Sequence, residues 1–128
     1  MIPLKKTPRL NGMKSSKKNL EKIIIPCCKT HEILKIDEIV RFEALQNYCR
    51  AILTNGSTLT STNTLGYYKE LLHNNGFISC HRSHLVNLDH IHKYHKEGSV
   101  ELSDNSTVPV SRRMKENFLN SLFDNYLC

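Results

Sequence analysis

Turn-forming residues divide this chain, from Ile23 onward, into short apolar runs such as IIIPCC, VRFEAL, YCRAIL and FISCHR. Runs of this length, with their Ile, Val, Phe and Tyr content, are typical of β-strands and too short for the helices of a bundle. Asn55-Gly56 lies between two such runs and predicts a tight hairpin, and Asp104-Asn105 predicts a second turn. A chain interrupted this often has to build its core mainly from short strands.

Two segments have the spacing of helices instead. In TLGYYKELLHNNG, Thr64 is a candidate N-cap and Gly76 a candidate left-handed stop; in SRRMKENFLNSLF, Ser111 is the candidate N-cap. The apolar residues that recur at helical spacing are Leu65, Tyr68 and Leu72 in the first segment, and Met114, Phe118, Leu119 and Leu122 in the second. We therefore predict a mainly β, α+β domain with seven or more short strands, one central helix and one C-terminal helix.

The net charge of the chain lies entirely in its first 22 residues. Residues 1–22 hold seven of the 18 basic residues and one of the 12 acidic residues, so this segment carries +6 and residues 23–128 are formally neutral. A basic leader that contains Pro and Ser is typical of a solvated linker, and we predict a flexible arm over 1–22 and one domain over 23–128. A second interpretation is an arm that adds contacts to nucleic-acid phosphates. No apolar run is long enough for a signal peptide or a membrane span, and we expect no membrane partner.

The cysteines show no disulfide framework and no metal-ligand spacing. They are odd in number and contain no C-x-x-C pair, at positions Cys27, Cys28, Cys49, Cys80 and Cys128. This usage favours reduced thiols in a cytoplasmic protein over disulfides or a zinc site.

Neither a metal site nor a catalytic site is predicted. On a strand, His90 and His92 would share a face, but His95 would fall on the other face and no Cys or carboxylate completes the set. Neighbouring strand residues such as Cys80 and His81 point to opposite faces, and no nucleophile–base pair is evident from their spacing. We expect surface imidazoles, no cofactor and no enzymatic activity.

Three polar breaks interrupt the apolar runs and offer similar chemistry. They are Gln46-Asn47-Tyr48, Arg82-Ser83 and Ser111-Arg112-Arg113. Each places an Arg or Asn, which can hydrogen-bond base edges, beside a Ser or Tyr, which can bind phosphate oxygens. A single break of this kind is most simply an ordinary solvated turn. The three together favour presentation to a ligand if they lie on one side of the molecule.

The residues around these breaks resemble a known family. FEALQNYCRAIL, LGYYKELL, GFISCHRSHLVNLDHI and TVPVSRRMKENFL, in this order, are similar to the LytTR-type DNA-binding domain, the output module of many bacterial two-component response regulators. The most specific phrases are F-I-x-x-H-R-S-H/Y-L-V-N-L-x-x-I and V-P-V-S-R-R-x-K. The resemblance runs from about Ile23 to Phe123. It implies an elongated arrangement of short strands in three sheets, with one small helix between them.

The resemblance also implies that loops, rather than a recognition helix, enter successive major grooves of double-stranded DNA. By position, the residues that read bases would be Asn47 and Tyr48 in the first loop, Arg82 in the second, and Arg112 or Arg113 in the third. Arg82 and Arg112 suit guanine O6 and N7. Residues expected to contact phosphates or to support the loops are Arg50, Lys69, His81, Ser83, Lys93, Lys96, Ser111 and Lys115. For His81 we favour a second interpretation, a half-buried strut that orients Arg82.

We therefore expect a cytoplasmic bacterial transcription regulator that binds promoter direct repeats, with a homodimer forming on DNA and no small-molecule substrate. Response regulators of this family carry a phosphoacceptor receiver domain, for which this chain has no room. We expect either a fragment of a longer regulator or a stand-alone LytTR protein. Two alternatives stay open: a LytTR-like module that binds and modulates a partner regulator, and a His/Cys metal sensor.

Overall fold

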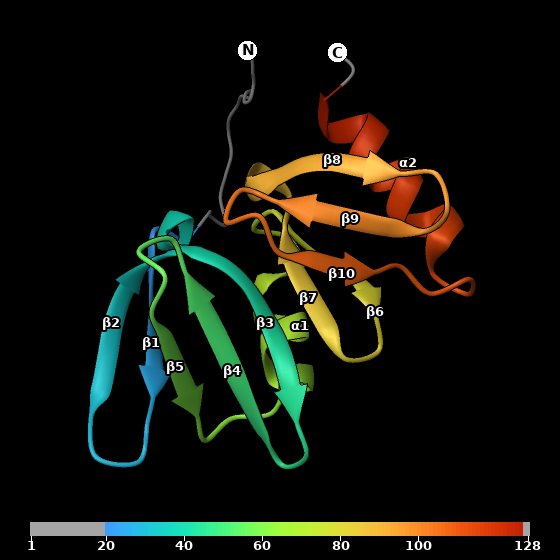
Figure 1. Cartoon of the computed structure of the whole chain (residues 1–128). Helices are drawn as coiled ribbons and strands as arrows, with labels where there is room; N and C mark the ends of the chain where they lie inside the picture. Colours follow the sequence, from blue (N-terminus) through green and yellow to red (C-terminus); the bar gives the residue numbers. More distant parts are fainter. Residues whose placement is uncertain (1–19, 127–128) are drawn as a thin grey trace.

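The computed structural model describes residues 20–126 and contains ten short strands and two α-helices (Figure 1). The strands are β1 (Lys22–Pro26), β2 (His31–Lys35), β3 (Ile39–Leu45), β4 (Tyr48–Leu53), β5 (Thr58–Ser61), β6 (Phe77–His81), β7 (His84–Asn87), β8 (Ile91–His95), β9 (Ser99–Leu102) and β10 (Thr107–Pro109). The helices are α1 (Leu65–Leu72) and α2 (Lys115–Tyr126), and two 3-10 turns span Ile36–Glu38 and Leu88–His90. The predicted mainly β architecture with a central and a C-terminal helix is confirmed.

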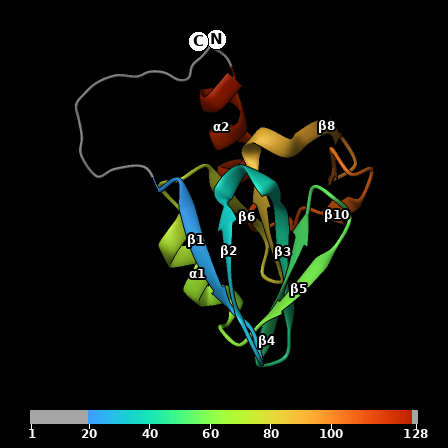
Figure 2. The same cartoon turned by 90° about the vertical axis from the view of Figure 1, so that its left-hand side faces the viewer.

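The strands form three antiparallel sheets, as the family resemblance implied. β1 and β2 form a two-stranded hairpin, the central sheet has the order β5-β4-β3-β7-β6, and the third sheet has the order β10-β9-β8. Viewed from its left-hand side, the molecule places the β1–β2 hairpin alongside the central sheet, with α1 against it (Figure 2). The central sheet therefore lies between the hairpin and the third sheet.

Two hydrophobic cores hold these layers together, and β3 contributes to both. Phe42 stacks on Tyr68 of α1 with ring centroids 4.4 Å apart in the first core, while Val40 packs with Phe118 of α2 in the second. Residues two apart on a regular strand share a face, so Val40 and Phe42 can face different cores only if the strand is irregular. The register of β3 does shift between Ile39 and Arg41, which is the signature of a β-bulge. This bulge lets one strand join the two cores.

Local signals in the sequence are matched by local hydrogen bonds. The side chain of Thr64 accepts a bond from the Tyr67 N–H at the start of α1, and Gly76 ends that segment with a φ of +85°. Gly56 has a φ of +89° in the β4–β5 hairpin, as the Asn-Gly pair predicted.

The prediction that Ser111 caps the C-terminal helix is wrong in one respect. Its hydroxyl accepts a bond from the Met114 N–H at 3.2 Å, but α2 begins only at Lys115. Ser111 therefore closes a turn before the helix.

Cys128 and residues 1–19 of the predicted N-terminal arm lie outside the described residues. Of that arm, Leu20, Glu21 and Lys22 are described, and Lys22 is the first residue of β1. The Leu20 N–H donates to the side-chain oxygen of Asn75 at 2.8 Å, which fixes where the chain enters the fold. Neither of the two helices between residues 20 and 126 has the length and apolar character needed to span a membrane.

Candidate nucleic-acid interface

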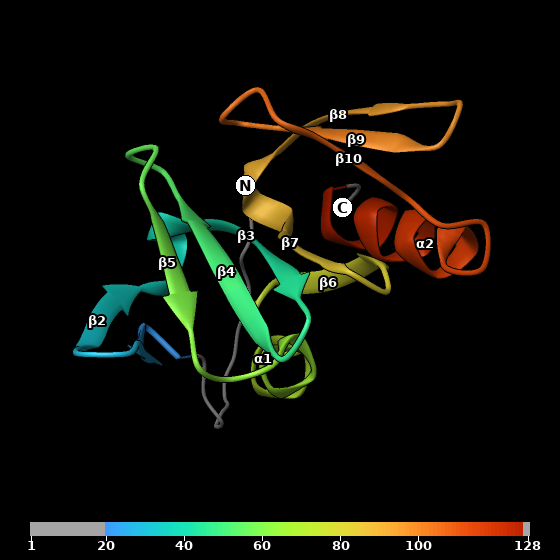
Figure 3. The same cartoon turned by 60° about the horizontal axis from the view of Figure 1, so that its bottom comes forward.

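Three turns follow one another along one edge of the molecule. The first joins β3 to β4 at Gln46 and Asn47, the second joins β6 to β7 at Arg82 and Ser83, and the third runs from Ser111 to the start of α2. Figures 1 and 3 show the β3–β4, β6–β7 and β10–α2 connections in this order, from the lower end of the central sheet to the start of α2. The three polar breaks therefore lie together, although they are far apart in the sequence.

Two main-chain hydrogen bonds fix the turns relative to one another, and one side-chain bond ties the second turn to α1. The Ala44 N–H, near the end of β3, donates to the carbonyl of Ser83 in the second turn at 2.9 Å. The Ser111 N–H, at the start of the third turn, donates to the carbonyl of Cys80 in β6 at 2.8 Å. The Lys69 ammonium on α1 donates to the carbonyl of Arg82 at 3.3 Å. The row of turns is thus one hydrogen-bonded unit.

The side chains predicted to read bases are all exposed at the tips of these turns. Asn47 and Tyr48 are exposed at the first turn, Arg82 at the second, and Arg112 and Arg113 at the third. With Gln46, which is also exposed, the row of turns presents three guanidinium groups, two amides and one phenol from the β-scaffold.

His81 and His84 lie on either side of the second turn, and His81 binds its backbone. Nδ1 of His81 accepts a hydrogen bond from the Ser83 N–H at 3.1 Å, and the His81 ring lies 5.5 Å from the ring of His84. Burial, together with the nearby positive charge of Arg41, holds the pKa of His84 below its usual value. His81 is half-buried, and its ring accepts a hydrogen bond from the backbone of its own turn.

An ion-pair network that sequence reasoning missed lies behind the first turn. Glu43 on β3 accepts hydrogen bonds from Arg41 and from Arg50 on β4, both at 2.9 Å. Burial by itself raises the pKa of Glu43, but the hydrogen bond and charge of Arg41 and the charge of Arg50 outweigh it, so this pKa lies below its ordinary value. The signal available in the sequence was the cross-strand pairing of Glu43 with Arg50 once a hairpin at Gln46-Asn47 is assumed.

The residues expected to contact phosphates are placed differently from one another. Arg50 and Lys69 are engaged with Glu43 and with the second turn, as described above. Lys115 is half-buried at the start of α2, beside the third turn. Lys93 on β8 and Lys96 in the β8–β9 turn are exposed on the third sheet, away from the first turn (Figures 1 and 3). The structure therefore brings Arg50, Lys69 and Lys115 to the row of turns and leaves Lys93 and Lys96 apart from its first member.

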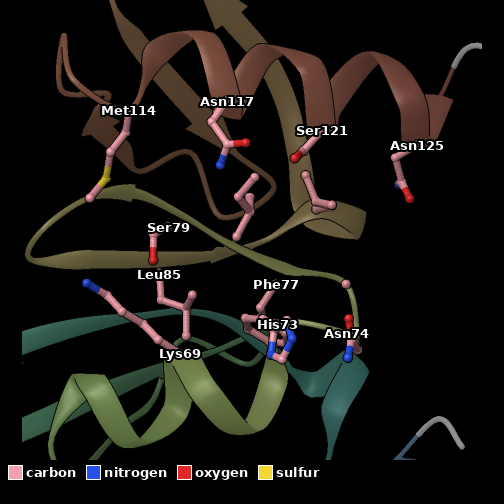
Figure 4. A pocket seen from close by; sticks show the side chains of 13 residues that line it. Lys69, His73, Asn74, Phe77, Ser79, Leu85, Met114, Asn117, Ser121 and Asn125 are labelled. Atoms are coloured by element: carbon pink, nitrogen blue, oxygen red, sulfur yellow. The ribbon is translucent and has the colours of Figure 1, made fainter. Parts of the chain in front are cut away.

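A groove of about 550 Å³ runs beside the row, between α1 and α2. Figure 4 shows Lys69 of α1 and His73, which follows that helix, on one wall. Asn117 and Ser121 of α2 form the other wall, and Ser79 of β6 lies between the two. None of the described residues that line it is acidic. The groove thus combines one cation, Lys69, and several amides with an apolar part formed by residues such as Phe77 and Leu85.

His90 and the buried thiols of Cys49 and Cys80 lie outside the three turns and make contacts within the protein. Nδ1 of His90 hydrogen-bonds with the Ser103 hydroxyl at 2.9 Å, and its Nε2 hydrogen-bonds with the carbonyl of Asp37 at 2.8 Å. Within residues 20–126, no group of three His, Cys, Asp or Glu side chains could hold a metal ion. Burial raises the pKa of both Cys49 and Cys80 to about 12, so these thiols are kept protonated in the cores.

Comparison with known proteins shows that this arrangement of short strands in three sheets belongs to a class of DNA-binding domain. The family model described as the LytTr DNA-binding domain matches residues 29–123, and the chain belongs to this family. A solved structure titled "LytTr DNA-binding domain of putative methyl-accepting/DNA response regulator" from Bacillus cereus is similar in fold. It has a TM-score of 0.71 and 21% sequence identity, and the match covers 81% of this chain and 98% of that chain. A comparison with the curated proteins found no match.

Proposed function

We propose that this protein is a transcription regulator that binds double-stranded DNA sequence-specifically through the row of three turns. The observation that supports this most directly is that three exposed polar turns are joined by main-chain hydrogen bonds into one edge. Such an edge can meet a duplex without first paying the entropy of ordering its loops. Successive turns along it would enter successive major grooves.

Base readout would come from the exposed tips. Arg82 and Arg112 have the planar fork that pairs with O6 and N7 of guanine, and Asn47 can pair with adenine in the same bidentate way. Arg113 offers a second guanidinium at the third turn, and Tyr48 offers a hydroxyl and an apolar ring at the first.

Phosphate contacts and support would come from the residues around the tips. Arg50 and Lys115 lie beside the first and third turns, and Ser83 and Ser111 lie within the second and third. Lys69 and His81 bind the backbone of the second turn, so we assign them mainly to orienting Arg82. Lys93 and Lys96 would reach only DNA that continues past the third turn.

The cellular setting follows from the family. We place the protein in the bacterial cytoplasm, as the output module of a two-component response regulator or as a stand-alone regulator, bound as a homodimer on promoter direct repeats. The basic segment 1–22 would add contacts to phosphates that do not depend on sequence.

Selection of bound duplexes from a random pool tests this function, followed by affinity measurements on the selected site. Arg82→Ala should weaken binding by about 1–3 kcal/mol and relax the base preference at one position, because a bidentate guanine contact is lost. Lys29→Ala is the matched control, since it removes one exposed cation from the β1–β2 turn, away from the row. It should leave base preference unchanged. If both variants behaved alike, the assignment of the second turn would be wrong.

A partner-binding module is the second candidate, and exposed apolar residues on β1, β2 and α2 favour it. The same selection separates the two functions. A protein that enriches no sequence from the pool, at low salt as well as high, would point to the partner-binding function.

A further inference from the structure

The outer face of the β1–β2 hairpin is apolar at its centre and basic at one end. Ile24 and Ile33 are directly paired across the two strands, and they are 56% and 65% exposed. Their neighbours on the strands, Ile23 and Ile25, point the other way and are buried in the first core. Lys22 pairs with Lys35 two residues from the isoleucines, so both ammonium groups flank the same face. We refer to Lys22, Ile24, Ile33 and Lys35 as the hairpin face.

The outer side of α2 has the complementary chemistry. Phe118 and Leu122 turn inward to the second core, whereas Phe123 is 54% exposed. Glu116 and Asn120, seven and three residues before Phe123, lie on the same outward side at helical spacing and are exposed. Asp124 follows Phe123 directly, about 100° further round the helix, and is also exposed. We refer to these three residues and Phe123 as the helix face.

The two faces lie at opposite ends of the molecule. Figures 1 and 3 both place the β1–β2 hairpin at one end and α2 at the other, with the central sheet between them. The row of three turns runs in the same direction, from the hairpin end towards α2. A contact between the hairpin face of one molecule and the helix face of the next would therefore repeat along the direction in which the turns succeed one another.

We propose that copies of this chain associate head to tail, the hairpin face of one copy binding the helix face of the next. The aromatic ring of Phe123 packs on the Ile24–Ile33 pair, and Glu116 and Asp124 approach the ammonium groups of Lys22 and Lys35. Such a heterologous contact relates neighbours by a shift along one line rather than by a two-fold axis. The proposal rests on the proposed function, because copies that bind DNA and contact each other head to tail would occupy neighbouring sites in the same orientation.

The size of the two faces predicts a weak contact. Three partly exposed apolar side chains offer far less area than the ~1,200 Å² buried in small stable interfaces. The free chain is therefore expected to associate only at high concentration. On DNA, two copies bound to adjacent sites are held at a high effective concentration, where a weak contact becomes sufficient.

Association of the full chain tests the proposal without any knowledge of the DNA site. Sedimentation velocity of the wild type up to millimolar concentration should show species larger than a dimer. Ile33→Ser and Phe123→Ser should each weaken association roughly tenfold or more, as expected for an anchor residue of a small interface. An equimolar mixture of the two variants should form a 1:1 complex and nothing larger, because each retains the face that the other has lost. Tyr67→Ser, which alters an exposed aromatic residue of α1 outside both faces, is the control and should associate like the wild type.

Three results would overturn the head-to-tail contact: a wild type that stays monomeric, a loss caused by Ile33→Ser but not by Phe123→Ser, or a mixture that forms no complex. The second result would indicate hairpins that pair with themselves. Binding of each variant to a DNA probe with one selected site separates this proposal from the proposed function. Monomers that bind the probe normally refute only the contact, and association without any DNA binding refutes only the regulator.

Discussion

Replacing Glu43 by Gln removes the negative charge that joins Arg41 to Arg50 behind the first turn. The Arg41 side chain is only 14% exposed and that of Glu43 only 21%, whereas Arg50 is 41% exposed. Breaking a buried ion pair by removing one partner costs about 3–5 kcal/mol, and an exposed pair contributes about 1 kcal/mol or less. The Arg41–Glu43 pair is closer to the buried case, but the side-chain oxygen of the introduced glutamine would still accept a hydrogen bond from Arg41. We therefore expect Glu43→Gln to lower the free energy of unfolding by about 2 kcal/mol at pH 7.

Urea unfolding followed by circular dichroism measures this loss, and thermal melting should show a fall in Tm of roughly 8 °C for a domain of this size. Glu101→Gln is the matched control. Glu101 accepts from His95 at 3.2 Å, and this pair carries opposite charges only when His95 is protonated. This control should change stability by less than about 0.5 kcal/mol.

The effect of Glu43→Gln should also depend on pH, with a sign set by the lowered pKa of Glu43. A carboxyl whose pKa is lower in the folded state stabilises the fold fully above its ordinary pKa of 4.5, and this stabilisation is lost as the pH falls through the folded value. The difference between wild type and variant should be constant near neutral pH and shrink below about pH 4.5. A loss under about 0.5 kcal/mol at pH 7, or an equal loss at pH 3 and pH 7, would refute the charge-based reasoning.

Two further predictions concern the cores. Tyr68→Phe should lower stability by about 1 kcal/mol in urea unfolding, because the hydroxyl that lies 2.6 Å from the Ser61 hydroxyl in the buried core is lost while the stack on Phe42 stays; an equal loss in the exposed-site control Tyr67→Phe would contradict this. Cys49 and Cys80, buried and with pKa values near 12, should resist maleimide at pH 8 for as long as the protein is folded, whereas exposed Cys28 should react. Mass spectrometry of the labelled peptides would show the difference, and labelling of either buried thiol without denaturant would count against it.

Features that depend on neighbouring residues were predictable from the sequence. The cap at Thr64, the glycine conformation at Gly56 and the polar character of all three breaks follow from local patterns. These patterns act within a few residues, so no knowledge of the packing is needed to read them.

Features that depend on distant residues were not predictable in this way. The pairing of β3 with β7 joins Phe42 to Leu85, and the bulge near Val40 sends one strand to two cores. The start of α2, at Lys115 rather than directly after Ser111, also could not be predicted from local patterns. The Ser111 N–H binds the carbonyl of Cys80, a contact between distant residues that no local pattern shows, and a separate turn precedes α2. The Arg41–Glu43–Arg50 network likewise exists only once β3 and β4 are paired.

The two main-chain hydrogen bonds that space the three turns, Ala44 to Ser83 and Ser111 to Cys80, do not depend on side-chain identity. Both join a peptide N–H to a peptide carbonyl, and every amino acid except proline supplies both groups. Exchanging the exposed side chain of Asn47, Arg82 or Arg112 therefore leaves the distance between neighbouring tips intact. In the proposed function, a substitution at one tip would therefore change one contact with DNA and leave the spacing of the other two tips unchanged.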